Sequence, residues 1–300
     1  LNTVGPALMD HGTEEQKKRF LPGIAAGELH FSIGYTEPSA GTDLAALKTA
    51  AVKQDDHYLV NGNKVYTSAA EAADYIFLAA RTDPDAPKHK GISILVVDTS
   101  DPGFSYGPIH TVGGVRTNVS YYTDIKVPLD MIIGAENQGW RLITSQLNHE
   151  RVGLAAWGIH GWRLFRGVLE WAREPRGPNG ERVIDDPAAQ RNLAEVYAHL
   201  EAMRVMNARM AWQLEHNPVD AVFPSAIKVY SSEIMLELCK LMMDVVGPQA
   251  MVAPGGPGEF MHGDLEHEHR RSLIITFGGG VVEVLRGLVA THGLGMAQHR

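Results

Sequence analysis

Residues Tyr35 to Asp43 read YTEPSAGTD and follow a strand-like stretch that begins at Phe31. This segment gathers hydroxyl side chains and a glycine, and hydroxyls together with backbone N–H groups can bind the polar edge of a ring or a phosphate. The same residue types also make ordinary turns. The segment alone is therefore compatible with a ligand-binding turn and with a structural turn. The surrounding sequence is needed to distinguish the two.

The sequence around this segment predicts an antiparallel β domain. From about Phe31 to Val127, β-branched and aromatic residues recur in short runs that turn residues separate. Asn61-Gly62 stands between two of these runs, and this dipeptide is typical of a tight hairpin turn. We expect strands at residues 58–60, 64–67, 75–79 and 92–97.

The second half of the chain is predicted to be helical. It contains four long segments that are mostly free of proline, which favours a bundle of four helices. The third segment carries apolar residues at helical spacing from Ala226 to Val245, a stripe suited to a bundle core. Near the start of the chain, a short helix is expected at Glu14–Phe20, with Thr13 as its N-cap and a break at Pro22-Gly23. The long helices are expected at residues 142–172, 188–214, 226–246 and 281–288.

Composition limits the classes of function. The chain has 300 residues, 44% of them hydrophobic, which is enough for a large core. The net charge is −8 and no long basic run is present, so nucleic acid is not an expected partner. The single cysteine, Cys239, excludes an internal disulfide framework, and the apolar runs are too short for a membrane span. Residues Leu1–Arg19 lack the order of a signal peptide, so we expect a soluble, cytoplasmic protein.

Several segments, in order along the chain, are similar to the acyl-CoA dehydrogenase family. Besides YTEPSAGTD they are GTEEQKKRFLPGIAAGE, NGNKVYTSAAEAADYIFLAAR, IKVPLDMIIGAENQGW, NHERVGLAA and TFGGGVVEVLRGLVATHGLGM. The resemblance implies an α+β fold in which a middle antiparallel β domain and a C-terminal four-helix bundle hold FAD, together with an N-terminal helical domain that is largely absent from this chain. We expect a remnant of the N-terminal domain at residues 1–30, the β domain at 31–132 and the bundle at 133–300.

The resemblance also implies which residues of the YTEPSAGTD segment contact the cofactor. Tyr35 and Thr36 would face the isoalloxazine ring of FAD, with Thr36 as a hydrogen-bond partner. Gly41 and Thr42 would lie nearby, toward both the substrate and the cofactor. This segment is therefore the first part of the predicted flavin site.

Two more flavin contacts are implied in the segment 61–81. Tyr66 stands where the family usually has Trp, and Ser68 stands where it usually has Thr. An aromatic ring and a hydroxyl are therefore both kept at these positions.

A further flavin contact is implied from a neighbouring subunit. Arg176 would reach the FAD pyrophosphate of that subunit as a charge-assisted donor. The loop around Arg176 lacks the aromatic residue that the family usually has there, and Asp244 stands where an amide is common. Because Asp244 would repel a pyrophosphate, the expected assembly is either a homotetramer or an α2β2 heterotetramer with a related chain.

The catalytic base is predicted at an uncommon position. In most of the family this Glu lies at the position of Gly279, where a glycine cannot abstract a proton. A subset of the family carries the Glu just before an Arg on the first bundle helix, and Glu150-Arg151 matches that pair. Although a helical Glu is usually a surface residue, we predict Glu150 as the base, Arg151 as a CoA anchor and Gly279 as part of a widened acyl pocket. Glu283 is the rival carboxylate.

Three other features have structural interpretations. The stretch His262–His269 is rich in histidine and carboxylates but lacks a recognised ligand spacing, so we expect a solvated loop and no metal site. The glycines Gly278–Gly280 are not surrounded by a nucleotide-binding motif. Cys239 is expected to be a buried helix residue, not a nucleophile.

The expected function is FAD-dependent α,β-dehydrogenation of an acyl-CoA thioester, with electrons passed to an electron-transfer flavoprotein. The glycines at 278–280 favour bulky acyl groups, steroid side chains among them. Two alternatives stay open on the sequence: a non-catalytic partner subunit of a heteromeric acyl-CoA dehydrogenase, and an acyl-CoA oxidase-like flavoenzyme that uses oxygen.

Overall fold

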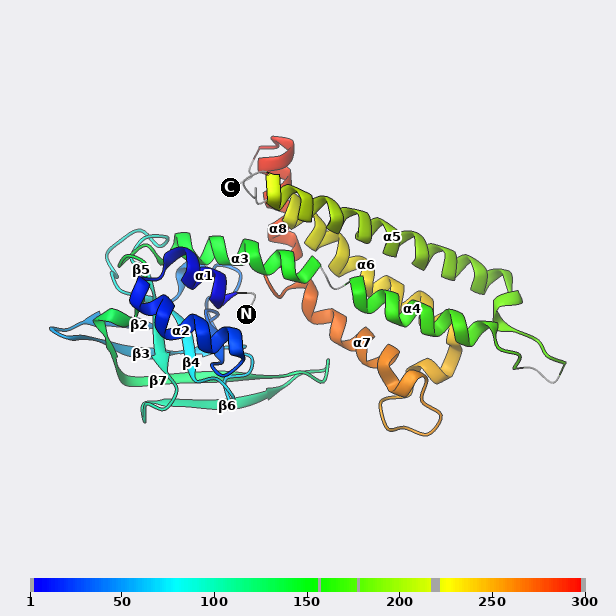
Figure 1. Cartoon of the computed structure of the whole chain (residues 1–300), viewed down its shortest axis with the longest axis horizontal. Helices are drawn as coiled ribbons and strands as arrows, with labels where there is room; N and C mark the ends of the chain where they lie inside the picture. The colour runs from blue at the N-terminus through cyan, green and yellow to red at the C-terminus, as the bar shows by residue number, and fades with distance from the viewer. Residues whose placement is uncertain (1–2, 156–157, 177–178, 217–221, 298–300) are drawn as a thin grey trace. The chain divides into compact units, whose positions relative to one another are not determined.

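The chain folds into two compact units, each with its own hydrophobic core. The computed structural model in Figure 1 describes residues 3–155, 158–176, 179–216 and 222–297. Unit 1 comprises Leu1–Thr111 and Val115–Glu150, and unit 2 comprises Val112–Gly114 and Arg151–Arg300.

Unit 1 is built around an eight-stranded sheet with the order β6-β7-β3-β2-β4-β5-β8, in which β1 pairs with β4 off this path. The predicted antiparallel domain is confirmed, except that β4 pairs in parallel with both β1 and β2. The strands are β1 (Phe31–Gly34), β2 (Ala50–Lys53), β3 (His57–Val65), β4 (Tyr75–Arg81), β5 (Ile92–Asp98), β6 (Phe104–His110), β7 (Arg116–Pro128) and β8 (Ile132–Ile133).

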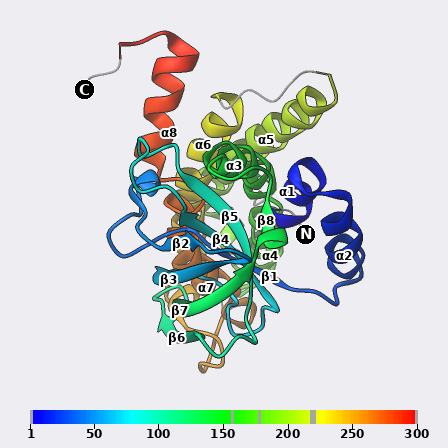
Figure 2. The ribbon, with the colours of Figure 1, turned by 90° about the vertical axis from the view of Figure 1, so that its left-hand side faces the viewer.

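The centre of the sheet explains why two strands are apolar throughout. β4 and β5 are almost continuously buried along their lengths, so both of their faces must be covered. Residues of α1 (Val4–His11) and α2 (Glu14–Ala26) belong to the same core as these strands, and Figure 2 shows the two helices beside the sheet. The short N-terminal helices therefore cover one face of the β domain.

The predicted hairpin turn at Asn61-Gly62 is wrong. β3 runs straight through both residues and pairs with β7, with a shift of register between Val60 and Gly62. A Cβ at Gly62 would lie 2.6 Å from the Thr49 side-chain oxygen, so the glycine permits a close approach of β2 and a bulge, not a turn. The β2–β3 hairpin instead closes at Gln54–His57, where the Gln54 N–H donates to the His57 carbonyl at 2.8 Å.

The first part of the predicted short helix is confirmed, and its end is not. Thr13 caps α2 in a reciprocal capping box with Gln16, as its position before the helix predicted. The helix continues through Pro22 and ends at Gly27, whose φ of 74° is the left-handed conformation of a helix C-cap. Phe20 and Ile24 are buried on either side of the proline, so packing outweighs its local cost.

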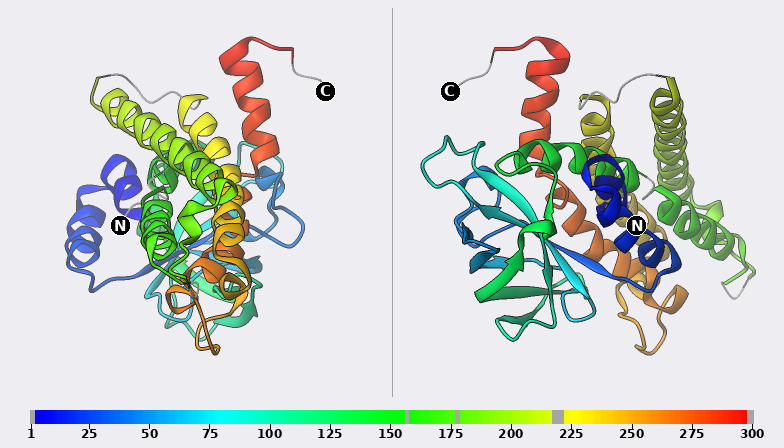
Figure 3. Two further views of the ribbon diagram at one scale, coloured as in Figure 1. Left: turned by 90° about the vertical axis from the view of Figure 1, so that its right-hand side faces the viewer. Right: turned by 60° about the vertical axis from the view of Figure 1, so that its left-hand side comes forward.

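Unit 2 is helical, with α6 at its centre. Helices α4, α5, α7 and α8 all contact α6, and Figure 3 shows α4, α5 and α6 lying side by side. The predicted stripe is confirmed, since Leu238 and Val245 are buried and Tyr230, Ile234 and Leu241 pack against the same core. The helices are α4 (Gly158–Arg173), α5 (Pro187–His216), α6 (Val222–Val246), α7 (Asp264–Ser272) and α8 (Val282–Leu288).

Two helical predictions change. The segment predicted as one helix at 142–172 is described as α3 (Gly139–Ala155) and α4, with residues 156–157 outside the described part. The His-rich stretch predicted as a solvated loop is mostly the helix α7. Among the described residues, no helix is both long and apolar enough to cross a membrane.

Candidate active site

The YTEPSAGTD segment begins where β1 ends and forms a closed turn. Glu37 and Ala40 exchange backbone hydrogen bonds in both directions, with N to O distances of 3.2 and 3.1 Å. Val65, the last residue of β3, donates its N–H to the Thr36 carbonyl at 2.8 Å. The structure therefore brings Thr36 together with the residues around Tyr66, whereas Gly41 and Thr42 lie exposed on the rest of the turn.

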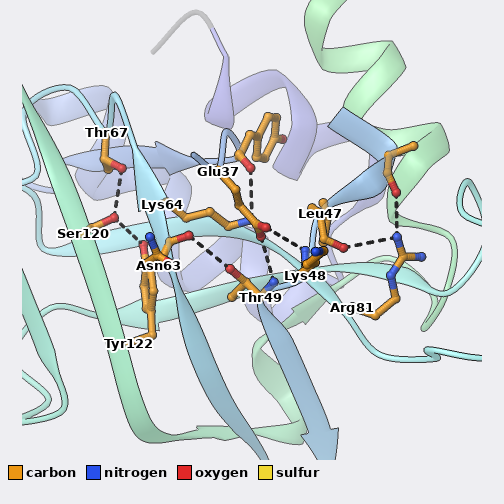
Figure 4. A network of polar contacts seen from close by, with 12 residues as sticks. Glu37, Leu47, Lys48, Thr49, Asn63, Lys64, Thr67, Arg81, Ser120 and Tyr122 are labelled. Atoms are coloured by element: carbon orange, nitrogen blue, oxygen red, sulfur yellow. Dashed lines mark hydrogen bonds and ion pairs between the residues drawn. The ribbon is translucent and has the colours of Figure 1, made fainter. Parts of the chain in front are cut away.

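A buried ion pair links the start of this turn to the residues that follow it (Figure 4). Lys64 donates from Nζ to the Glu37 carboxylate at 2.8 Å and to the Tyr35 carbonyl at 3.0 Å. The same carboxylate accepts the backbone N–H groups of Lys48 at 2.7 Å and Thr49 at 2.8 Å. One lysine and one glutamate thus tie the start of the segment to the chain that follows it.

Burial and charge act in opposite directions on this pair. Burial lowers the pKa of Lys64 to about 8, although the charge of Glu37 opposes that change. Burial by itself would raise the pKa of Glu37, but the Lys64 charge and the hydrogen bonds from Lys64 and Thr49 outweigh it and hold that pKa below its ordinary value. The Glu37 carboxylate is therefore ionised at neutral pH, and its charge favours the protonated form of Lys64.

Tyr66 is presented to the outside in a conformation that costs energy. Its φ is 62°, a left-handed value that is uncommon for a side chain of this size, and its side chain is 61% exposed. The next residue, Thr67, is fixed by its N–H to the Asn118 carbonyl at 2.9 Å and by its hydroxyl to Ser120 at 2.9 Å (Figure 4). Ser68 is exposed as well. The Ser68 hydroxyl lies 3.3 Å from the hydroxyl of Thr117. The ring of Tyr66 and the hydroxyl of Ser68 are of the kinds that can pack on the face and bind the edge of a flavin ring.

Tyr35 connects this segment to α3. Its side chain is 7% exposed, and its hydroxyl donates a hydrogen bond to the side-chain oxygen of Gln146, which is 1% exposed. Glu150, the predicted base, lies on α3 four residues after Gln146. The side chains of Glu150 and Arg151 lie outside the described residues, so their predicted roles stay predictions.

The glycine loop of unit 2 is fixed by a buried lysine. Gly279 has a φ of 68° and Gly280 a φ of 108°, both left-handed values that favour glycine. Lys228 of α6 is 1% exposed, and its Nζ donates to the carbonyl of Gly280 at 2.6 Å and to that of Thr276 at 3.3 Å. Position 279 therefore carries no carboxylate, and its left-handed backbone conformation disfavours any residue with a side chain there.

The side-chain contacts described for Arg176 are all with residues close to it in the sequence. Its guanidinium lies 4.3 Å from the centre of the Trp171 ring and donates to Glu174 at 2.6 Å and to the Trp171 carbonyl at 3.2 Å. Trp171 supplies the aromatic neighbour that the loop sequence lacks, from the preceding helix α4. Glu174 places a negative charge beside Arg176, the residue predicted to bind the FAD pyrophosphate. Asp244 is exposed on α6.

The other candidates have structural positions. Cys239 is fully buried on α6, so the prediction of a buried helix residue is confirmed, and burial, with the charge of Glu268, raises the pKa of its thiol to about 12. Glu283 is exposed in the first turn of α8, where a carboxylate is favourable. Among the described residues, no group of His, Cys, Asp and Glu is arranged to hold a metal ion.

Among the buried polar residues that the sequence did not single out, Lys64, Gln146 and Lys228 make the contacts described above. A signal for Lys64 exists in the sequence, because the alternation along β3 places it on the inward side of the strand. A charge at an inward position requires a buried partner, and Glu37 is one of the two carboxylates in the YTEPSAGTD segment. Gln146 and Lys228 have no comparable signal, since their contacts depend on residues far away in the chain.

Family models match both parts of the chain. Residues 32–126 match the model described as acyl-CoA dehydrogenase, middle domain, and residues 137–294 match the model described as acyl-CoA dehydrogenase, C-terminal domain. The chain is 46% identical to acyl-CoA dehydrogenase FadE26 and 49% identical to acyl-CoA dehydrogenase FadE29, both of Mycobacterium tuberculosis. These alignments cover 99% and 98% of this chain and 75% of each relative.

Solved structures give the same result. The structure described as the Tcur3481-Tcur3483 steroid ACAD matches with a TM-score of 0.94 and 49% identity over 99% of this chain and 76% of that one. The ChsE4-ChsE5 complex from Mycobacterium tuberculosis matches with a TM-score of 0.93 and 45% identity, over 99% of this chain and 77% of that chain. With two domain models and relatives that match nearly all of its length, the chain belongs to the acyl-CoA dehydrogenase family, whose members are flavin-dependent enzymes.

Proposed function

We propose that this acyl-CoA dehydrogenase oxidises a bulky acyl-CoA thioester between its α- and β-carbons with FAD, and that Glu150 is the base. The proposal depends on which residues occupy positions 279 and 150. Gly279 offers no carboxylate and has a φ of 68°, while α3 carries a Glu-Arg pair at the place that a subset of the family uses. The chemistry requires one carboxylate near the α-carbon, and Glu150 is the residue that fits.

The residues of unit 1 would hold the cofactor. Thr36 and Ser68 would donate or accept hydrogen bonds at the ring edge, and the exposed Tyr66 would pack on its face. Gly41 and Thr42 would line the side toward the substrate. Bound FAD would supply the acceptor for the hydride from the β-carbon. Glu150 would take the α-proton, in a pocket whose closure removes water and strengthens the base.

A bulky acyl group is proposed from the glycine loop. Gly278–Gly280 has no side chains, and Lys228 bonds the carbonyls of Thr276 and Gly280, so we propose that this loop would leave more room for the acyl group than a segment with side chains. One of the similar structures is described as a steroid ACAD. We therefore propose a thioester with a branched or ring-bearing acyl chain, and Arg151 as an anchor for its CoA.

The proposed assembly contains a related second chain. The Glu174 carboxylate already pairs with Arg176, and Asp244 is exposed, so this chain is a weak donor of positive charge to a neighbour's pyrophosphate. One similar structure is described as a complex of ChsE4 with ChsE5. We propose an α2β2 heterotetramer over a homotetramer, a cytoplasmic location, and an electron-transfer flavoprotein as the electron acceptor. We also propose the division into residues 1–30, 31–132 and 133–300.

Anaerobic bleaching of the flavin tests this function. A panel of CoA esters with straight, branched and ring-bearing acyl chains is mixed with the purified protein without oxygen, and the visible absorbance of the flavin is followed. Bleaching by the bulky esters with slow reoxidation in air is expected. A colourless protein would favour the non-catalytic partner subunit, and fast reoxidation would favour an oxidase.

A further inference from the structure

A buried hydrogen bond joins two parts of unit 1 that are far apart in the chain. The Tyr35 hydroxyl donates to the side-chain oxygen of Gln146, 111 residues later. Tyr35 immediately precedes Thr36 in the YTEPSAGTD segment, and Gln146 belongs to α3. The two side chains are 7% and 1% exposed, so water does not compete for this bond.

Gln146 is a polar side chain beside apolar core residues. Its neighbours Leu142 and Ile143 are 3% and 0% exposed and belong to the hydrophobic core of unit 1. The side-chain nitrogen of Gln146 has no hydrogen-bond partner among the described residues, and an unpaired buried N–H group is unfavourable. An apolar side chain would remove that cost but would leave the buried Tyr35 hydroxyl without its acceptor, so the part of Gln146 that matters is the oxygen bonded to Tyr35.

The position of the bond on α3 suggests a role for it. Residues four apart on a helix share one face and lie about 6 Å apart along the axis. Gln146 is four residues before Glu150, so fixing position 146 also fixes the rotation and the height of the turn that carries position 150. Tyr35 fixes the same point to the segment next to Thr36.

We propose that Tyr35 and Gln146 are positioning residues that set the placement of Glu150 relative to the flavin. The inference rests on the proposed function, in which the YTEPSAGTD segment holds the flavin and Glu150 takes the α-proton. The proton and the hydride leave adjacent carbons of one substrate, so the base and the flavin must be placed together to within a fraction of an ångström. A misplacement of about 1 Å can cost about 100-fold in rate.

The test uses Tyr35→Phe, Gln146→Met and the double variant. Each full-length protein is purified with its flavin and with any chain that co-purifies, and flavin reduction by a reactive CoA ester is followed by anaerobic stopped flow. Each single variant is expected to reduce about 10-fold or more slowly, while the Kd for the ester changes by less than about 3-fold. The double variant is expected to be no slower than the slower single one, because both changes break the same bond.

A second readout separates positioning from a general loss of structure. An ester deuterated at the α-carbon is expected to give a larger primary isotope effect in Tyr35→Phe than in the unsubstituted protein, because proton removal becomes the slower event. Tyr122→Phe is the matched control. Tyr122 is 2% exposed in the same unit, and its hydroxyl contacts that of Ser120 on the same strand, β7, at 3.1 Å. This variant is expected to lose stability but to keep the reduction rate and the isotope effect.

Three results would overturn the inference: an unchanged rate in Tyr35→Phe, an equal loss in Tyr122→Phe, or loss of the flavin from Tyr35→Phe. The failure of the proposed function looks different. In that case no ester bleaches the unsubstituted protein, or Glu150→Gln reduces its flavin at the full rate. If Glu150→Gln is inactive and Tyr35→Phe is fully active, the function stands and the positioning role is wrong.

Discussion

Lys64 and Glu37 form an ion pair, with 2.8 Å between Nζ and Oε1, in which the side chains are only 0% and 5% exposed. The pair connects β3 to the start of the segment that we propose to hold the flavin and to Lys48 and Thr49, which follow that segment. Removing one charge from such a pair leaves the other buried without compensation. The pair therefore governs both the stability of unit 1 and the shape of the YTEPSAGTD segment.

Lys64→Met is expected to destabilise unit 1 by about 3–5 kcal/mol, because it leaves the Glu37 carboxylate buried and unpaired. Urea unfolding followed by circular dichroism measures the change. Lys53→Met is the matched control, since Lys53 also contacts a carboxylate, Glu136, at 2.7 Å, but with 52% of its side chain exposed. The control is expected to change the urea midpoint little. Equal midpoints for the two variants would show that burial of the pair is not what matters.

The acid stability of the protein is expected to depend on Glu37. Its pKa is lowered in the folded chain, so its contribution is complete above its ordinary value of 4.5 and is lost as the pH falls through the lowered value. Urea midpoints of the unsubstituted protein and of Glu37→Gln, measured from about pH 7 to pH 3, are expected to differ most near neutrality and to converge in acid. A gap that is constant over this range would contradict the ionic role of Glu37.

Tyr66→Leu is expected to weaken flavin binding while leaving the fold intact. The ring is 61% exposed, so little of the core depends on it. Loss of ring stacking is expected to cost about 1 kcal/mol, or roughly fivefold in the Kd for FAD measured by flavin fluorescence. Tyr121→Leu removes a tyrosine that is 46% exposed on β7, and it is expected to leave the Kd unchanged. An unaltered Kd in Tyr66→Leu would remove Tyr66 from the flavin site.

Gly279→Ala is expected to lower kcat/KM for ring-bearing esters by about 10-fold more than for straight-chain esters, because one added methyl narrows the acyl pocket. It also strains a backbone with a φ of 68°, by about 1 kcal/mol. The control is Gly287→Ala, since a Cβ at this position of α8 meets no atom within 4 Å. If Gly279→Ala affected all esters equally, the loop would not be the part that selects bulky substrates.

The sequence predicted those parts of the fold in which one local rule applies. The apolar runs in β4 and β5, the stripe on α6 and the Thr13 cap of α2 each follow from spacing or from a single capping pair. At Asn61-Gly62 the rule that this dipeptide marks a hairpin turn was wrong. Gly62 instead leaves space for Thr49, the residue just before β2, to approach β3 closely. Such a contact cannot be read from neighbours in the sequence.

The helix α7 shows a different kind of miss. The histidines and carboxylates of residues 262–269 suggest either a metal cluster or a loop. The order of the charges along α7 instead favours a helix. Asp264 and Glu266 stand in the first turn, and Arg270 and Arg271 stand in the last, which is the arrangement that a helix dipole favours. Among the site residues, the motif positions came from resemblance, whereas Gln146 and Lys228 became visible only through the fold.

The measurement that tests the central claim most directly is the rate of flavin reduction in Glu150→Gln, compared with Glu283→Gln. Both variants remove one carboxylate and keep the size of the side chain. With a saturating CoA ester and no oxygen, Glu150→Gln is expected to keep its flavin and to lose at least about 100-fold in reduction rate, while Glu283→Gln stays close to the unsubstituted protein. Full reduction by Glu150→Gln, or the loss appearing in Glu283→Gln instead, would contradict the assignment of Glu150 as the base.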